Sequence, residues 1–179
     1  MAINLRSLAG AVRAGLRSLR RQAATTAASL PSTSYPGDFH GSATIRYTPT
    51  PDGDPDPGEV VWAWVPYEED PNRGKDRPVL LVGRHGRYLL GLMLTSRDRV
   101  PAAPPPAGMS FRPREGSGDY VELGPGAWDR QGRPSEVRVD RVLRIRPDSV
   151  RREGAVLDRK RFDAVASALV QRQGWTRHP

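Results

Sequence analysis

An arginine and two hydroxyl residues stand at the ends of predicted buried strands, where side chains can be held rigidly and still meet solvent. Arg77 opens the run RPVLLVG, and Thr95 and Ser96 close the run YLLGLMLTS. A guanidinium presents a planar fork of donors that matches phosphate oxygens, and a hydroxyl can donate one more hydrogen bond. The same residues also fit a purely structural interpretation, with Arg77 paired to Asp76 or Glu59 and Thr95 an ordinary strand residue.

A charged loop, EEDPNRGKD, separates the first predicted strand from Arg77. Its Arg73 and Lys75 could hold phosphates, although the mixed charges equally suit a solvated loop. His85 lies in the hairpin turn RHGR, where a solvated histidine needs no functional explanation. Trp62 and Trp64 alternate along one strand face, for which we expect burial under the terminal helix in preference to base stacking.

Short strands must position these residues. Gly and Pro number 18 each in 179 residues, which favours many turns over a helical bundle. The predicted strands are 60–65, 79–83, 88–94, 120–123, 136–139 and 142–145, followed by a helix over 158–173 with Asp158 as its N-cap. The expected fold is mainly β, a small antiparallel barrel with a C-terminal helix packed on it.

Composition narrows the range of functions. The chain has no cysteine, which excludes disulfides, thiolate zinc sites and a cysteine nucleophile. No apolar run reaches the roughly 20 residues that span a bilayer. A formal net charge of +8 favours an anionic partner, nucleic acid first and anionic lipid second.

The sequence predicts four parts. Residues 1–28 form a basic amphipathic helix or tail, which could contact RNA or, less expectedly, a membrane surface, or could be a poorly ordered appendage. Residues 29–57 are rich in Pro, Ser and Asp and predict a flexible linker, pinned briefly around residues 45–47. The folded domain is predicted over 58–174, with a short tail over 175–179.

Several motifs in order resemble the MazF/PemK family of toxins, closest to its actinobacterial branch. They are the GEVVW strand, the RPV strand, the LTSRD end, the Trp128-Asp129 pair, the VRVDRV strand and the RREGAVLD link. The resemblance implies an SH3-like β-barrel, usually a homodimer. It also implies a cytoplasmic growth inhibitor, the toxin of a type II toxin–antitoxin system, with a cognate antitoxin as partner.

The resemblance further implies an mRNA interferase, an endoribonuclease that cleaves single-stranded RNA without metal or other cofactor. The 2′-hydroxyl would attack the phosphate and leave a 2′,3′-cyclic phosphate and a 5′-hydroxyl. Arg77 and Thr95 would carry the site, with Ser96 as a further hydroxyl. The RNA-binding residues would be Arg73, Lys75 and Arg97. The general base and acid stay unassigned.

Two alternatives remain open on the sequence. One is a protein-directed toxin like the CcdB gyrase poisons, which resemble this family in fold and act by binding. The other is a degenerate, non-catalytic nucleic-acid-binding module. Arg77 together with Thr95 and Ser96 favours the nuclease, because a binding protein has no need for that combination.

Overall fold

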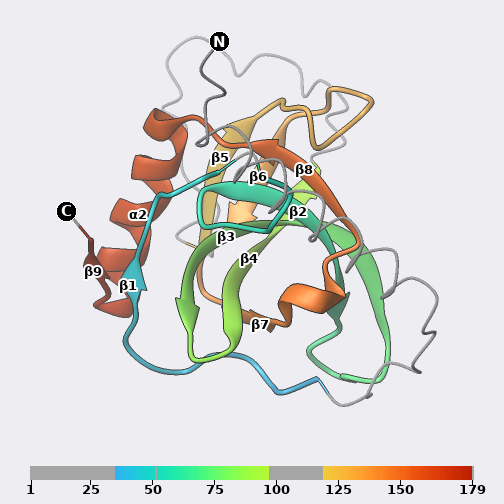
Figure 1. The fold of residues 1–179 in the computed structure, drawn as a ribbon, viewed down its shortest axis with the longest axis vertical. Helices are drawn as coiled ribbons and strands as arrows, with labels where there is room; N and C mark the ends of the chain where they lie inside the picture. Colours follow the sequence, from blue (N-terminus) through green and yellow to red (C-terminus); the bar gives the residue numbers. More distant parts are fainter. Residues whose placement is uncertain (1–34, 51, 97–118, 179) are drawn as a thin grey trace, which may run out of the picture. The chain divides into compact units, whose positions relative to one another are not determined.

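The structure, a computed structural model, describes residues 35–50, 52–96 and 119–178, and Figure 1 traces the chain. The expected helix over residues 1–28 and Arg97 lie outside these residues. The elements in chain order are β1 (Thr44–Ile45), β2 (Glu59–Pro66), β3 (Gly74–His85), β4 (Tyr88–Ser96), β5 (Tyr120–Gly124), β6 (Ser135–Arg138), β7 (Leu143–Ile145), the 3₁₀ turn η2 (Pro147–Ser149), β8 (Arg152–Val156), α2 (Arg159–Gln173) and β9 (Thr176–Arg177).

A curled antiparallel sheet forms the centre of the fold. Its strand order is β5-β6-β4-β3-β2-β8, and β7 pairs with β4 beside β6. β4 therefore has β3 along one edge and both β6 and β7 along the other. Figure 1 shows that the sheet is strongly curled and that α2 lies along one side of it. The mainly β, SH3-like barrel fold with a C-terminal helix is confirmed.

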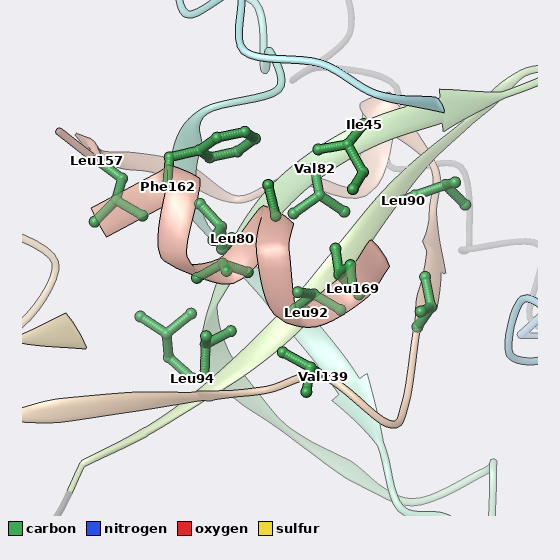
Figure 2. Packing of buried hydrophobic residues seen from close by; sticks show 14 of the residues in the cluster. Ile45, Leu80, Val82, Leu90, Leu92, Leu94, Val139, Leu157, Phe162 and Leu169 are labelled. Carbon is green, nitrogen blue, oxygen red and sulfur yellow. The ribbon is translucent and has the colours of Figure 1, made fainter. Parts of the chain in front are cut away.

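Alternating side chains of the central strands build two apolar clusters, one on each face of the sheet. On one face Leu80 and Leu92 pack against Phe162 and Leu169 of α2, as Figure 2 shows. On the other face Val61, Ala63, Val65, Val79, Leu81, Leu89, Leu143 and Ile145 form the second cluster. The helix has its predicted cap, because the Asp158 side chain accepts a hydrogen bond from the Arg161 backbone N–H at 3.0 Å. Among the described residues no helix is both long and apolar enough to cross a bilayer.

Two glycines let the central hairpin form as predicted. Gly86 has a φ of +57°, which closes the turn between β3 and β4. Gly91 lies opposite Leu81, and a Cβ atom there would come within 2.5 Å of Val79 Cγ1. The second cluster can close over β4 only because this position has no side chain.

The first hairpin is longer than predicted. β3 begins at Gly74 instead of residue 79, and its early residues pair with Trp62–Pro66 of β2. They are polar and lie beyond the core, so the sequence shows no apolar alternation there. The two tryptophans share a face, as expected, but neither is fully buried. Trp64 is 37% exposed and packs beside Gly74.

Residues 35–50 and 52–57, expected to belong to a flexible linker, are part of the compact unit, which begins at Tyr35. Phe39 is 7% exposed and Ile45 is 2% exposed. The Arg141 guanidinium is 7% exposed, bonds the Asp38 carboxylate at 2.9 Å and also donates to the Pro66 carbonyl. A few anchors with partners far away in sequence therefore hold a segment whose composition suggests flexibility.

The predicted tail also belongs to the fold. Trp175 is 2% exposed, and its indole N–H donates to the Gly41 carbonyl at 2.8 Å. Its ring meets Phe39 edge-on, with centroids 5.7 Å apart. The next residues form β9, which pairs in parallel with β1 beside α2 (Figure 1). The folded unit thus extends past residue 174 at one end and before residue 58 at the other.

Candidate functional site

Three polar side chains follow one another across one face of the sheet. In the ladder of β3 and β4, Val79 lies opposite Met93, and Arg77 and Thr95 each lie two residues further on the same face. Thr95 is the direct partner of Glu136 on β6. We call Arg77, Thr95 and Glu136 the polar row. Since directly opposed residues of an antiparallel pair have Cβ atoms about 4.5–5.5 Å apart, Thr95 and Glu136 are close neighbours.

The two strands that carry Arg77 and Thr95 separate at this point. Beyond the Val79–Met93 pair, the start of β3 runs along β2, where Arg77 lies opposite buried Ala63. The end of β4 runs along β6 instead. The guanidinium and the hydroxyl therefore come from strands that diverge, which leaves both side chains half-buried and not packed into the core.

Arg77 is not engaged by the acids that the sequence offered as partners. Asp76 pairs with Arg151 at 3.3 Å. Glu59 is 7% exposed and accepts a hydrogen bond from the Asp56 backbone N–H at 3.2 Å. Among the residues that the structure describes, none forms a hydrogen bond or ion pair with the Arg77 side chain. Its donors are thus available to an anion.

The two predicted hydroxyls are brought to different faces. Successive strand residues point to opposite sides of a sheet, so Ser96 faces away from the polar row. Its partner on β6 is Ser135, which is 4% exposed and whose Oγ accepts the Trp128 indole N–H at 3.1 Å. Of the two hydroxyls, Thr95 shares a face with Arg77 and is the ladder partner of Glu136, whereas Ser96 is on the opposite face.

The predicted RNA-binding cations differ in their placement. Lys75 precedes Arg77 by two residues on β3, is exposed, and shares its face. Arg73 lies in the loop between β2 and β3, which is closed by backbone bonds from Tyr67 N–H to the Arg73 carbonyl at 2.8 Å and from Arg73 N–H to the Asp70 carbonyl at 3.0 Å. A turn of this kind holds the Arg73 backbone in place while its side chain stays exposed.

An ion-pair cluster lies two residues further along β6. Arg138 bonds Asp140 through two contacts of 2.6 Å, and it also bonds Glu68 of the loop after β2. Burial acts to raise the pKa of Asp140, but the hydrogen bond and charge of Arg138 outweigh it and lower that pKa below its ordinary value. The hydrogen bond with Asp140 raises the pKa of Arg138 in turn. This cluster fastens the loop to the sheet.

Sequence reasoning did not identify Glu136, Arg138 or Asp140 as site residues. The alternation in EVRVD was a usable signal, because it puts the three charged residues on one strand face and the valines on the other. What the sequence could not supply is that β6 lies beside the end of β4. That neighbour relation depends on the sheet order.

The polar row offers a cation, a hydroxyl donor and a carboxylate in sequence across three strands. Such a set can bind a phosphate through Arg77 and Thr95 while a proton acceptor lies next to the hydroxyl. Within residues 35–50, 52–96 and 119–178, no three His, Asp or Glu side chains gather closely enough to hold a metal ion.

Comparison with known proteins gives one family match. The model of the family described as PemK-like, MazF-like toxin of type II toxin–antitoxin system matches residues 56–172. This range includes the whole polar row and the ion-pair cluster of Arg138. No curated protein matches the chain significantly.

Solved structures of similar proteins have low sequence identity to this chain. An endoribonuclease from a mycobacterial species, in complex with its cognate antitoxin, is 17% identical with a TM-score of 0.45, over 67% of this chain and 95% of that one. The MazE–MazF complex from Deinococcus radiodurans is 19% identical with a TM-score of 0.44, over 67% of this chain and 96% of that one.

Proposed function

Because the chain belongs to the family of PemK-like, MazF-like toxins of type II toxin–antitoxin systems, we propose that it is an endoribonuclease of the mRNA interferase type. It cleaves single-stranded RNA by attack of a 2′-hydroxyl on the adjacent phosphate. The products are a 2′,3′-cyclic phosphate and a 5′-hydroxyl. The protein needs no metal for this reaction, since the substrate supplies its own nucleophile.

Arg77 and Thr95 bind the scissile phosphate in this proposal. The phosphate gains negative charge as the 2′-oxygen attacks, and a fixed guanidinium stabilises that charge more than it stabilises the ground state. The Thr95 hydroxyl donates to a second phosphate oxygen. Lys75, on the same face as Arg77, and Arg73 in the adjoining loop contact phosphates further along the strand.

The observation that carries the proposal is the state of Arg77. It lies half-buried in the part of β3 that pairs with β2, it shares a face with Thr95, and it forms no hydrogen bond or ion pair with any residue that the structure describes. A structural arginine at this position would pair with Asp76 or Glu59, but both carboxylates are bonded elsewhere. A cation held in this way is suited to an anionic substrate.

Incubation of the purified protein with single-stranded RNA in excess EDTA tests the proposal. We expect site-selective cleavage, with a 2′,3′-cyclic phosphate on the upstream fragment and a 5′-hydroxyl on the downstream one. Mass spectrometry of the fragments identifies both ends. An intact RNA, under conditions where the protein is folded, would refute the nuclease and favour a binding toxin or a non-catalytic module.

Substitution of Thr95 by valine should slow cleavage less than loss of Arg77. Valine keeps the β-branched shape, so the strand should remain intact and only the hydroxyl is removed. One hydrogen bond to a charged group contributes about 1.5–3 kcal/mol, which corresponds to a decrease in kcat/KM of roughly ten- to a hundredfold. Ser96→Ala is the matched control, since its side chain faces the other way and we expect cleavage close to wild type.

A cognate antitoxin is the expected protein partner, as the family description implies. We also propose that the toxin is a homodimer, on the resemblance to the family. Co-expression with the product of the neighbouring gene, followed by light scattering on the free toxin and on the complex, measures both. A monomeric free toxin would contradict the proposed homodimer and would not affect the proposal of RNA cleavage.

A further inference from the structure

The proposed cleavage needs a group that removes the proton of the attacking 2′-hydroxyl. A guanidinium keeps its proton at physiological pH and cannot accept another. A threonine hydroxyl is a donor to the phosphate and a poor base in water. The base must therefore be a third side chain, within reach of a phosphate held by Arg77 and Thr95.

Glu136 meets this requirement by its place in the sheet. It is the direct ladder partner of Thr95, on the same face, with Cβ atoms expected about 4.5–5.5 Å apart. Its side chain is half-buried, and its Oε2 atom is shielded from solvent. Arg77 lies on the other side of Thr95. A phosphate bound at Thr95 thus has the cation towards β3 and the carboxylate towards β6.

Other charged groups surround Glu136, and each occupies a different position relative to Thr95. Glu122 on β5 is the ladder partner of Glu136 on its far side, one strand further from Thr95. Arg138 follows on the same strand and face, held by Asp140 and Glu68. Glu136 is thus the carboxylate whose ladder position adjoins the Thr95 hydroxyl.

We propose that Glu136 is the general base of the cleavage, an inference that rests on the proposed function. Its carboxylate takes the proton from the 2′-hydroxyl as the bond from the 2′-oxygen to phosphorus forms. The bond from phosphorus to the 5′-oxygen then breaks, and that oxygen takes a proton from water. The hydroxide so formed accepts the proton from Glu136, which restores the carboxylate with no net change in protons.

The test compares Glu136→Gln with Glu122→Gln, which changes the same side chain one strand further out. We expect the first variant to lower kcat by about 10²- to 10⁴-fold, the usual contribution of a general base. The second should cleave at close to the wild-type rate. Both should bind, with wild-type affinity, an RNA analogue that carries a 2′-deoxynucleotide at the cleaved position. Glu136→Asp, which keeps a carboxylate, should retain more activity than Glu136→Gln.

Two further readouts separate a base from a structural residue. The fall in wild-type kcat towards acid pH should disappear in Glu136→Gln. The other charged residues that face the site, Arg77, Glu122 and Arg138, are unchanged in that variant. A substrate with sulfur in place of the 5′-oxygen has a leaving group that needs no proton, so it should leave the Glu136→Gln defect unchanged. Rescue by that substrate would make Glu136 the acid and overturn the assignment.

The outcomes distinguish this inference from the proposed function. An inactive wild-type protein would mean that the nuclease proposal itself is wrong. An active wild type with undiminished cleavage by folded Glu136→Gln would overturn the role of Glu136 alone. An equal loss in Glu122→Gln, or lost binding of the deoxy analogue by Glu136→Gln, would also overturn it, since neither fits a base that acts only on the 2′-hydroxyl.

Discussion

Replacement of Arg77 by alanine is expected to remove almost all RNA cleavage while the fold survives. The residue lies opposite Ala63 at the start of β3, outside the apolar clusters, so its loss leaves no core cavity. Loss of a preorganised donor at a charge-bearing oxygen costs about 2.7–4 kcal/mol, or roughly 10²- to 10³-fold in kcat. Single-turnover cleavage of a fluorescent RNA measures the effect.

Lysine at the same position should restore only part of the rate. An ammonium keeps the charge but cannot make the planar two-point contact of a guanidinium with phosphate. Arg87→Ala is the control for a general loss of positive charge. That side chain is exposed in the turn between β3 and β4, donates to the Tyr88 hydroxyl at 3.1 Å and lies over the Tyr88 ring. Wild-type cleavage by a folded Arg77→Ala protein would contradict the assignment of Arg77.

The central strands could be predicted because their apolar runs are uninterrupted. Residues 79–83 and 88–94, with Gly86 between them, form the predicted hairpin, and the spacing of Phe162, Val165 and Leu169 marks α2. The two-residue strands β1 and β9 have no periodicity of their own. They exist because distant segments meet, and no local pattern carries that information.

The candidate site could be predicted in part. The sequence placed Arg77 and Thr95 at strand ends, and the register puts them on one face. Strand alternation alone implies that the Ser96 side chain points to the opposite face from Thr95, although the family motif suggested that both hydroxyls belong to the site. Glu136 could be placed only from the sheet order, since residues 97–134, 38 residues of chain, separate β4 from β6 and no local pattern shows that the two strands pair.

The family assignment rests on a sequence match, whereas the proposed roles of the site residues rest on the geometry of the sheet. Membership of the toxin family follows from the match over residues 56–172. The placement within an actinobacterial branch stays a prediction, as do the roles of individual residues. What the fold contributes is the order of the polar row, in which a hydroxyl lies between a cation and a carboxylate. Because of that order, we can propose phosphate binding for Arg77 and Thr95 and proton transfer for Glu136, and test each role separately.

Replacement of Trp175 by alanine is expected to destabilise the protein by about 3–5 kcal/mol, the range for an aromatic side chain removed from a core. The indole is 2% exposed, packs on Phe39 and donates to the Gly41 carbonyl. Its loss leaves a cavity in the core and removes contacts that hold the segment with Phe39, Gly41 and β1 against the rest of the fold. Because the free energy of unfolding of a typical protein is only about 5–15 kcal/mol, this loss would be a large fraction of it. Urea unfolding at neutral pH measures the change.

Two variants show whether the effect comes from burial at this position. Val170→Ala removes an apolar side chain that is 38% exposed on the nearby helix, and we expect a change within about 0.5 kcal/mol. Trp175→Phe keeps an aromatic ring but loses the bond to Gly41, so its cost should lie between the other two. Removal of residues 175–179 should destabilise at least as much as Trp175→Ala, since it deletes β9 as well. If Trp175→Ala cost no more than Val170→Ala, residues 175–179 would be a tail after all, and the folded unit would end at residue 174.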